Sequence, residues 1–196
     1  MKILVSGFKP FRGESLNPSE LLATELALEF DNVQAIILPV EFSVCFEVFR
    51  RHLENENYDY VIMLGQAAGR RKICLEKVAL NWVQTTGGDE AGVVPAIGPI
   101  YPDQALALMS EFPVDAICDI LKLESHPVQI SFSAGTFVCN DLYYRTLSNF
   151  KNIKSVFVHL PLVPQQLKPN DPRFALPLEE QKIILSKLIN ELRLVQ

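Results

Sequence analysis

Three side chains in this chain could together perform nucleophilic catalysis: Cys139, His159 and Glu76. A thiolate attacks carbonyl carbon readily, a neutral imidazole can accept the thiol proton, and a carboxylate can hold that imidazole in one orientation. The three residues are far apart in the sequence, and their spacing alone does not show that they meet. The elements that carry them decide whether such a relay exists.

Cys139 lies where a β-prone run gives way to a helical pattern. The run VQISFS is followed by a small-residue turn at Ala134 and Gly135, and an amphipathic helix starts near the cysteine. The first turn of a helix has unpaired N–H groups and the positive end of the helix dipole, so we expect the thiolate to be favoured there. A free cysteine is also often a small core residue, and the turn does not separate the two interpretations.

The other two candidates lie in strand patterns. If strands at 128–133 and 154–160 are parallel with a helical crossover between them, Cys139 and His159 both emerge at the carboxyl edge of the sheet. The segment 72–82, KICLEKVALNW, alternates like one strand and places Glu76 among apolar neighbours. A carboxylate there needs a partner, and a histidine or a nearby Arg or Lys would serve equally well.

Strand and helix patterns alternate along the chain, which predicts a single α/β domain over residues 1–196 with a mainly parallel, helix-covered sheet. The segment 84–104 is rich in Gly and Pro and has little pattern, so we expect a long surface excursion there. Strands are expected at 2–6, 33–40, 58–64, 72–82, 128–133 and 154–159, and helices at 18–29, 42–55, 114–123, 139–149 and 178–194.

Composition narrows the class of protein. The 196 residues are 48% hydrophobic and 21% charged, and no apolar run approaches the ~18 residues of a membrane span, so a soluble protein with no membrane partner is expected. The net charge of −5 and the short basic clusters give no footprint for nucleic acid.

The ends and the cysteines of the chain complete these expectations. The start MKILVSGFKPF reads as a first strand and not as a signal peptide, which favours a cytoplasmic location. The four cysteines have no CxxC spacing, so neither a zinc site nor a disulfide framework is expected, and no metal or cofactor is called for.

Several blocks of the sequence resemble one known family. GFKPFRGESLNPS, GQAAGR, LEKVALN, SAGTFVCNDLYY and FVHLPLVPQQ follow one another as they do in the pyroglutamyl peptidase (pyrrolidone-carboxylate peptidase) family. The resemblance covers nearly the whole chain. It implies a three-layer α/β/α sandwich and a cysteine peptidase without a metal that removes N-terminal pyroglutamate from peptides through an acyl-thioester. It also implies a homo-oligomer, a tetramer or a dimer.

The resemblance also assigns roles to individual residues. Cys139 matches the nucleophile, His159 the general base and later general acid, and Glu76 the residue that fixes the imidazole. Aromatic side chains would contact the lactam ring, and polar side chains would support the N-terminal loop and the substrate pocket. The residue before the nucleophile would line that pocket. The residues that match these binding positions are Phe8, Phe11, Asn17, Gln66 and Val138.

The sequence departs from the family pattern in two loops. Where the family has GFxPFGG, this chain carries Lys9 and Arg12, and where the family has an arginine before IPDNxG, this chain has Thr86. Two alternatives therefore stay open: a related cysteine amidohydrolase with altered specificity, and a non-catalytic member that binds a small ligand. Cys74 shares a strand face with Glu76 and could titrate or oxidise near the site.

Overall fold

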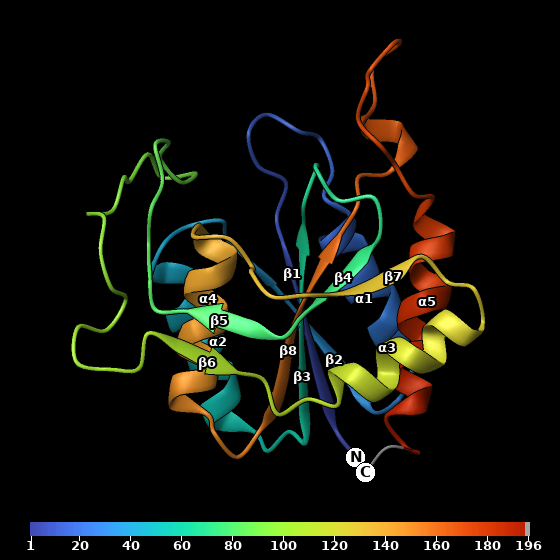
Figure 1. Cartoon of the computed structure of the whole chain (residues 1–196), viewed down its shortest axis with the longest axis horizontal. Helices are drawn as coiled ribbons and strands as arrows, with labels where there is room; N and C mark the ends of the chain where they lie inside the picture. The colour runs from blue at the N-terminus through green and yellow to red at the C-terminus, as the bar shows by residue number, and fades with distance from the viewer. Residues whose placement is uncertain (195–196) are drawn as a thin grey trace.

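A six-stranded sheet forms the centre of the molecule, with the strand order β2-β1-β3-β8-β4-β7 (Figure 1). The computed structural model describes residues 1–194. The strands of this sheet are β1 (Ile3–Phe8), β2 (Val33–Leu38), β3 (Tyr60–Gln66), β4 (Ile73–Glu76), β7 (Val128–Ser131) and β8 (Lys154–Leu160).

Helices cover both faces of the sheet, so the predicted α/β/α sandwich is confirmed (Figure 1). Two separate hydrophobic cores result, one between the sheet and each helical layer. The helices on one face are α1 (Pro18–Glu29), α3 (Val114–Leu123) and α5 (Leu178–Glu191), and those on the other are α2 (Val44–Asn55) and α4 (Val138–Asn149).

The alternation of each strand decides which side chains face which layer, because successive side chains point to opposite faces. In β8, Val156 and Val158 belong to the core beneath α1, α3 and α5, whereas Phe157 belongs to the core beneath α2 and α4. His159, two residues after Phe157, therefore shares the α2/α4 face. The site is built on that face.

The strand directions correct one prediction. The strands β2, β1, β3 and β8 are parallel, but β4 pairs antiparallel with β8 and parallel with β7. The sheet is mainly parallel, as predicted, yet β7 runs opposite to β8, so the expected parallel pair at 128–133 and 154–160 is wrong. The link from β3 to β4 spans only residues 67–72, which is too short for a helical crossover, so the chain returns antiparallel.

The segment 72–82 is also not one strand. It divides into β4 and β5 (Val78–Leu80), and β5 leaves the main sheet to pair antiparallel with β6 (Ala107–Met109). At the break, the Lys77 N–H donates to Ser131 O at 2.7 Å while Lys77 O accepts from Ser110 N at 2.9 Å. The alternation continues through the break, so the pattern does not reveal it, and β6 was not predicted.

The remaining elements agree with the sequence patterns to within a few residues at their ends. Residues 81–106 connect β5 to β6 and include the excursion predicted at 84–104 (Figure 1). A short 3₁₀ helix, Pro164–Gln166, follows β8. Within residues 1–194, no helix is both long and apolar enough to cross a lipid bilayer.

Candidate active site

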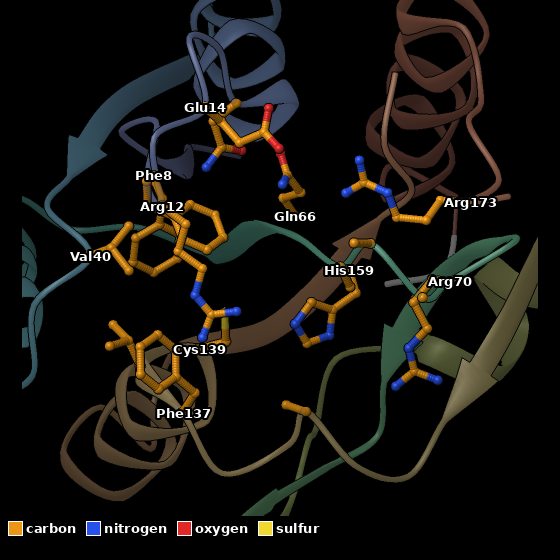
Figure 2. A pocket seen from close by; sticks show the side chains of 17 residues that line it. Phe8, Arg12, Glu14, Val40, Gln66, Arg70, Phe137, Cys139, His159 and Arg173 are labelled. Carbon is orange, nitrogen blue, oxygen red and sulfur yellow. The ribbon is translucent and has the colours of Figure 1, made fainter. Parts of the chain in front are cut away.

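A cavity of about 640 Å³ opens at the carboxyl ends of β1, β3 and β8. Its volume lies in the ~300–1,000 Å³ range of typical small-molecule sites. Of the eight site residues expected from the sequence, all except Glu76 line this cavity, and Glu76 is buried behind His159. The structure therefore brings together side chains that lie far apart in the chain (Figure 2).

Glu76 and His159 form a close, buried polar contact. Glu76 Oε1 lies 2.8 Å from His159 Nδ1, and the Glu76 side chain is fully buried. In the β4–β8 ladder Cys74 is opposite His159, so Glu76, two residues further along β4, is its diagonal neighbour on the same face. The carboxylate oxygen accepts, so Nδ1 carries the proton and Nε2 remains as the basic nitrogen.

Glu76 has a second partner in Arg70. A guanidinium nitrogen of Arg70 lies 3.4 Å from Glu76 Oε1 and donates to Ser131 Oγ and to Ser133 O, both at 3.1 Å. Both partners that the sequence left open, a histidine and an arginine, are thus present. The other carboxylate oxygen, Oε2, is buried without a hydrogen bond from residues 1–194, so the nearby positive charge of Arg70 offsets part of the cost of burying it.

The thiol of Cys139 rests over a glycine of the neighbouring strand. Cys139 is the second residue of α4, and Gly65 of β3 pairs with His159 of β8. A Cβ atom at position 65 would lie 3.3 Å from Cys139 Sγ and 2.6 Å from the Phe157 ring, so only glycine leaves room for the thiol there. The thiol consequently lies beside the strand that carries His159, on the same face as Glu76.

The start of α4 is held in place by Asn140, which the sequence analysis did not identify. Its side chain behaves like a strand backbone toward β5: Oδ1 accepts from Leu80 N at 2.9 Å, and Nδ2 donates to Leu80 O at 2.8 Å and to Trp82 O at 3.1 Å. A turn at Gly135, with φ of 80°, brings the chain from β7 to this point. This clamp positions the thiol in place of the parallel crossover that was expected.

The pKa of the thiol depends on its surroundings in the folded chain. Burial raises the pKa of Cys139 to about 12, and the negative charge of Glu76 acts in the same direction. This effect opposes that of the helix N-terminus, which the sequence predicts to favour the thiolate. With a raised pKa, the thiol needs a base to remove its proton during attack.

The first turn of α4 offers hydrogen-bond donors to the cavity. The residue before the helix is Phe137, which has no side-chain oxygen and, within the described chain, supplies no cap. The first N–H groups of a helix have no intrahelical partner, so those beside Cys139 are free for a ligand oxygen. Such donors stabilise an oxyanion that forms on a carbonyl under attack.

The loop after β1 is fastened to the start of α1. Asn17 is the N-cap of α1: its Oδ1 accepts from Ser19 N at 3.0 Å and from Ser19 Oγ at 2.8 Å. Ser19 Oγ in turn accepts from Phe8 N at 3.0 Å, and Asn17 Nδ2 donates to Lys9 O at 3.1 Å. The polar groups of Asn17 thus support the end of β1 and the loop after it, which carry the aromatic wall of Phe8 and Phe11.

Gln66 is oriented by Gln166, which is not among the eight site residues expected from the sequence. Gln166 Nε2 donates to Gln66 Oε1 at 2.8 Å, and Gln166 Oε1 accepts from Val163 N at 3.1 Å. Because its oxygen is engaged, the amide nitrogen of Gln66 is left as a donor toward the cavity. Gln166 lies in the motif FVHLPLVPQQ, which was the available signal for it.

Comparisons with known proteins identify the family. The family model described as pyroglutamyl peptidase matches residues 1–186. The chain belongs to this family. A pyrrolidone-carboxylate peptidase 1 from Caldanaerobacter subterraneus is 39% identical over 184 residues, which is 90% of this chain and 91% of the relative. A pyrrolidone-carboxylate peptidase from Vibrio vulnificus is 39% identical over 89% of this chain and 85% of its own length.

Solved structures of family members share the fold over nearly the whole length. The pyrrolidone carboxyl peptidase from Fervidobacterium islandicum superposes with a TM-score of 0.92 at 29% identity, covering 98% of each chain. Pyroglutamyl peptidase I from Bacillus amyloliquefaciens gives 0.88 at 31% identity, covering 95% of this chain and 94% of its own.

The residues that depart from the family pattern fall in different places. Arg12 lines the cavity, whereas Lys9 and Thr86 are outside the lining set of residues 1–194. The Arg12 guanidinium lies 5.9 Å from the Phe11 ring centre and 5.6 Å from that of Phe137. The cavity wall also includes Glu14, Val40 and Arg173, which carried no signal in the sequence because they come from irregular segments.

Cys74 does not line the cavity. It is buried, its Sγ accepts from Gln129 Nε2 at 3.2 Å, and burial raises its pKa. Cys45 and Cys118 are buried as well, and all four cysteines are free thiols. Over the described range 1–194, no group of three or more His, Cys, Asp and Glu side chains is arranged to hold a metal ion.

Proposed function

We propose that this protein is a pyroglutamyl peptidase that removes pyroglutamate from the N-terminus of peptides, with Cys139, His159 and Glu76 as its catalytic groups. The observation that carries the proposal is the buried 2.8 Å contact between Glu76 and His159 in a wall of the cavity that also holds the thiol. Membership of the family supplies the substrate class.

The first step forms a tetrahedral intermediate that leads to the acyl-thioester. Cys139 Sγ attacks the main-chain carbonyl carbon of the pyroglutamyl residue while His159 Nε2 takes the thiol proton. The C–S bond forms, and the carbonyl electron pair moves onto its oxygen. The free N–H groups at the start of α4 stabilise that oxyanion, and Glu76 stabilises the imidazolium.

The second half returns the enzyme to its starting state. The oxyanion collapses, the C–N peptide bond breaks, and His159 gives its proton to the departing amine. A water molecule then attacks the carbonyl carbon of the acyl-thioester while His159 takes a proton from that water. The C–S bond breaks, pyroglutamate leaves, and the proton returns to Cys139. The sum is one peptide bond hydrolysed by one water molecule.

The cavity wall suits a neutral lactam. Phe8 and Val138 are buried, and Phe11 is partly buried, so together they offer apolar surface to a flat five-membered ring. The amide nitrogen of Gln66 can donate to the lactam carbonyl. Asn17 acts indirectly by holding the end of β1 and the loop after it, which carry Phe8 and Phe11.

We also propose that the chain acts as one domain in the cytoplasm and assembles into a homo-oligomer, a tetramer or a dimer. The insertion of β8 between β3 and β4 supports one domain, and four free thiols suit a reducing compartment. Exposed apolar side chains on the excursion and β6 support self-association; they are Val93, Val94, Ile97, Leu106 and Met109. Light scattering during size-exclusion chromatography tests the assembly, and a monomer at all concentrations would contradict it.

The test of the activity is hydrolysis of a fluorogenic pyroglutamyl amide, with Cys139→Ser as the control. We expect turnover that disappears in the variant. Absence of turnover together with rapid alkylation of Cys139 would instead favour an amidohydrolase of altered specificity. Absence of turnover with Cys139 no more reactive than Cys45 or Cys118 would favour a ligand-binding protein.

A further inference from the structure

Three guanidinium groups line the cavity, and two of them already have partners. Arg70 is held by Glu76, Ser131 and the Ser133 carbonyl. Arg173 donates to Asp171 Oδ2 at 2.6 Å and to Oδ1 at 3.0 Å. Hydrogen bonding to Asp171 raises the pKa of Arg173, and the negative charge of Glu14 acts in the same direction.

Arg12 is different. Across residues 1–194, no carboxylate lies within 4.0 Å of its guanidinium, which instead lies near the Phe11 and Phe137 rings. Glu90 accepts from the backbone N–H of Arg12 at 2.9 Å and so pins the loop without pairing the side chain. Among the described residues, Arg12 thus brings to the cavity a positive charge without an ion-pair partner, in a lining that also contains the carboxyl group of Glu14.

The position of Arg12 suggests which part of a substrate it would meet. Arg12 is exposed, whereas Phe8 and Val138, which also line the cavity, are buried. Figure 2 shows the Arg12 side chain reaching from its loop toward Phe137 and Cys139, while Arg70 and Arg173 lie on the far side of His159. If the lactam ring packs against Phe8 and Val138, the rest of the peptide extends from the buried part of the cavity toward solvent, past Arg12.

We propose, on the basis of the function proposed above, that Arg12 binds a carboxylate on the leaving part of the substrate. The protein then prefers pyroglutamyl peptides in which an acidic residue directly follows the pyroglutamate. The planar guanidinium matches a carboxylate with two parallel hydrogen bonds, and its contact with two aromatic rings restricts its motion. A neutral lactam itself offers no charge for Arg12 to recognise.

Isosteric substrates test this preference. The value of kcat/KM is measured for pyroglutamyl-Glu and pyroglutamyl-Gln peptides that carry a C-terminal amide, so that the side chain supplies the sole difference in charge. Because Arg12 is exposed, we expect a preference of about five-fold for Glu, which falls as salt is added. A second pair, pyroglutamyl-Ala with a free or an amidated C-terminus, shows whether a main-chain carboxylate serves instead.

The variant Arg12→Gln should bring the Glu-to-Gln ratio to about one, and Arg12→Lys should restore part of it. Lys9→Gln is the matched control, because it removes the same charge from the same loop but lies outside the cavity lining, and the ratio should stay as in the wild type. Equal rates on the Glu and Gln peptides would overturn this inference alone. If only the pyroglutamyl-Ala pair shows a preference, for the peptide with a free C-terminus, then Arg12 binds the main-chain carboxylate and not an acidic side chain. Failure to cleave any pyroglutamyl peptide would overturn the proposed function as well.

Discussion

The two sides of the cavity are built differently. The catalytic side is anchored to the sheet: Glu76 is fully buried, His159 is 5% exposed, and Cys139 lies over Gly65 at the start of a clamped helix. On the opposite side, Phe8 ends β1, and the loop after it carries Phe11, which is partly buried, and Arg12, which is exposed. Groups that must hold one geometry are on the sheet or on the helix clamped beside it, whereas Phe11 and Arg12 are on a segment that can vary without disturbing the sheet.

Substitutions in the relay should have the largest effects. We expect His159→Ala to lower kcat by about 10³-fold or more, because the group that moves the proton is removed. Glu76→Gln should lower it by about 10²-fold, because the amide only weakens the orientation of the imidazole and the stabilisation of its charge. Steady-state kinetics on a pyroglutamyl amide measures both, and near-ultraviolet circular dichroism checks the fold. Equal losses would mean that the roles are assigned wrongly.

Gly65→Ala should disturb the catalytic side of the cavity without changing any reactive group. The new methyl group would collide with Phe157 and press on the thiol, so we expect kcat to fall by about ten-fold or more and stability by about 1–3 kcal/mol. Urea denaturation and kinetics measure the two effects. Gly87→Ala is the matched control, because a Cβ there meets no atom within 4 Å. Similar behaviour of the two variants would contradict the placement of the thiol.

The pH dependence of thiol reactivity tests the electrostatics of the same side. A thiol with a raised pKa is protonated at neutral pH. As long as the pH stays below that pKa, each increase of one pH unit raises the thiolate fraction about ten-fold. In the protein without substrate, the alkylation rate of Cys139 by iodoacetamide should therefore still rise above pH 9. Buried Cys45 and Cys118 should react more slowly throughout. A plateau reached below pH 8 would reveal a preformed thiolate and contradict the neutral resting state.

Changes on the loop side should be smaller and should fall mainly on binding. We expect Phe11→Ala to raise KM for a pyroglutamyl amide about five-fold with little change in kcat, because it removes apolar wall and leaves the relay intact. Phe132→Ala is the control, because Phe132 is 66% exposed and outside the cavity lining. A fall in kcat comparable to that of Glu76→Gln would show that the two sides are not separable.

The sequence reaches the elements of the fold more readily than their directions. Hydrophobic periodicity located the helices and most strands, and the alternation in 72–76 correctly placed Cys74 and Glu76 on one face. It could not show that β4 turns back beside β8, because direction depends on the length of a connection and on which strand inserts beside it. The division between β4 and β5 was equally hidden, since alternation does not record the sheet to which a strand belongs.

For the site, local sequence and tertiary environment have different parts. The turn at Gly135 and the helix after it mark Cys139 as unusual, and the resemblance supplies its partners. The direction of its pKa shift depends on burial and on Glu76, which come from the folded chain. Arg70, Asn140 and Gln166 lie in the motifs that carry the resemblance, but they act through contacts with residues 6, 60 and 100 positions away, so no local pattern reveals their roles.

The central claim is that Cys139 carries the acyl group, and peptide mapping of an acid-quenched reaction tests it most directly. The protein is mixed with a pyroglutamyl amide, quenched in acid at short times and digested, and the peptides are weighed by mass spectrometry. We predict a pyroglutamyl thioester on the peptide that contains Cys139, which disappears together with turnover in Cys139→Ser. Full turnover by Cys139→Ser, or an acyl group on another residue, would contradict the account.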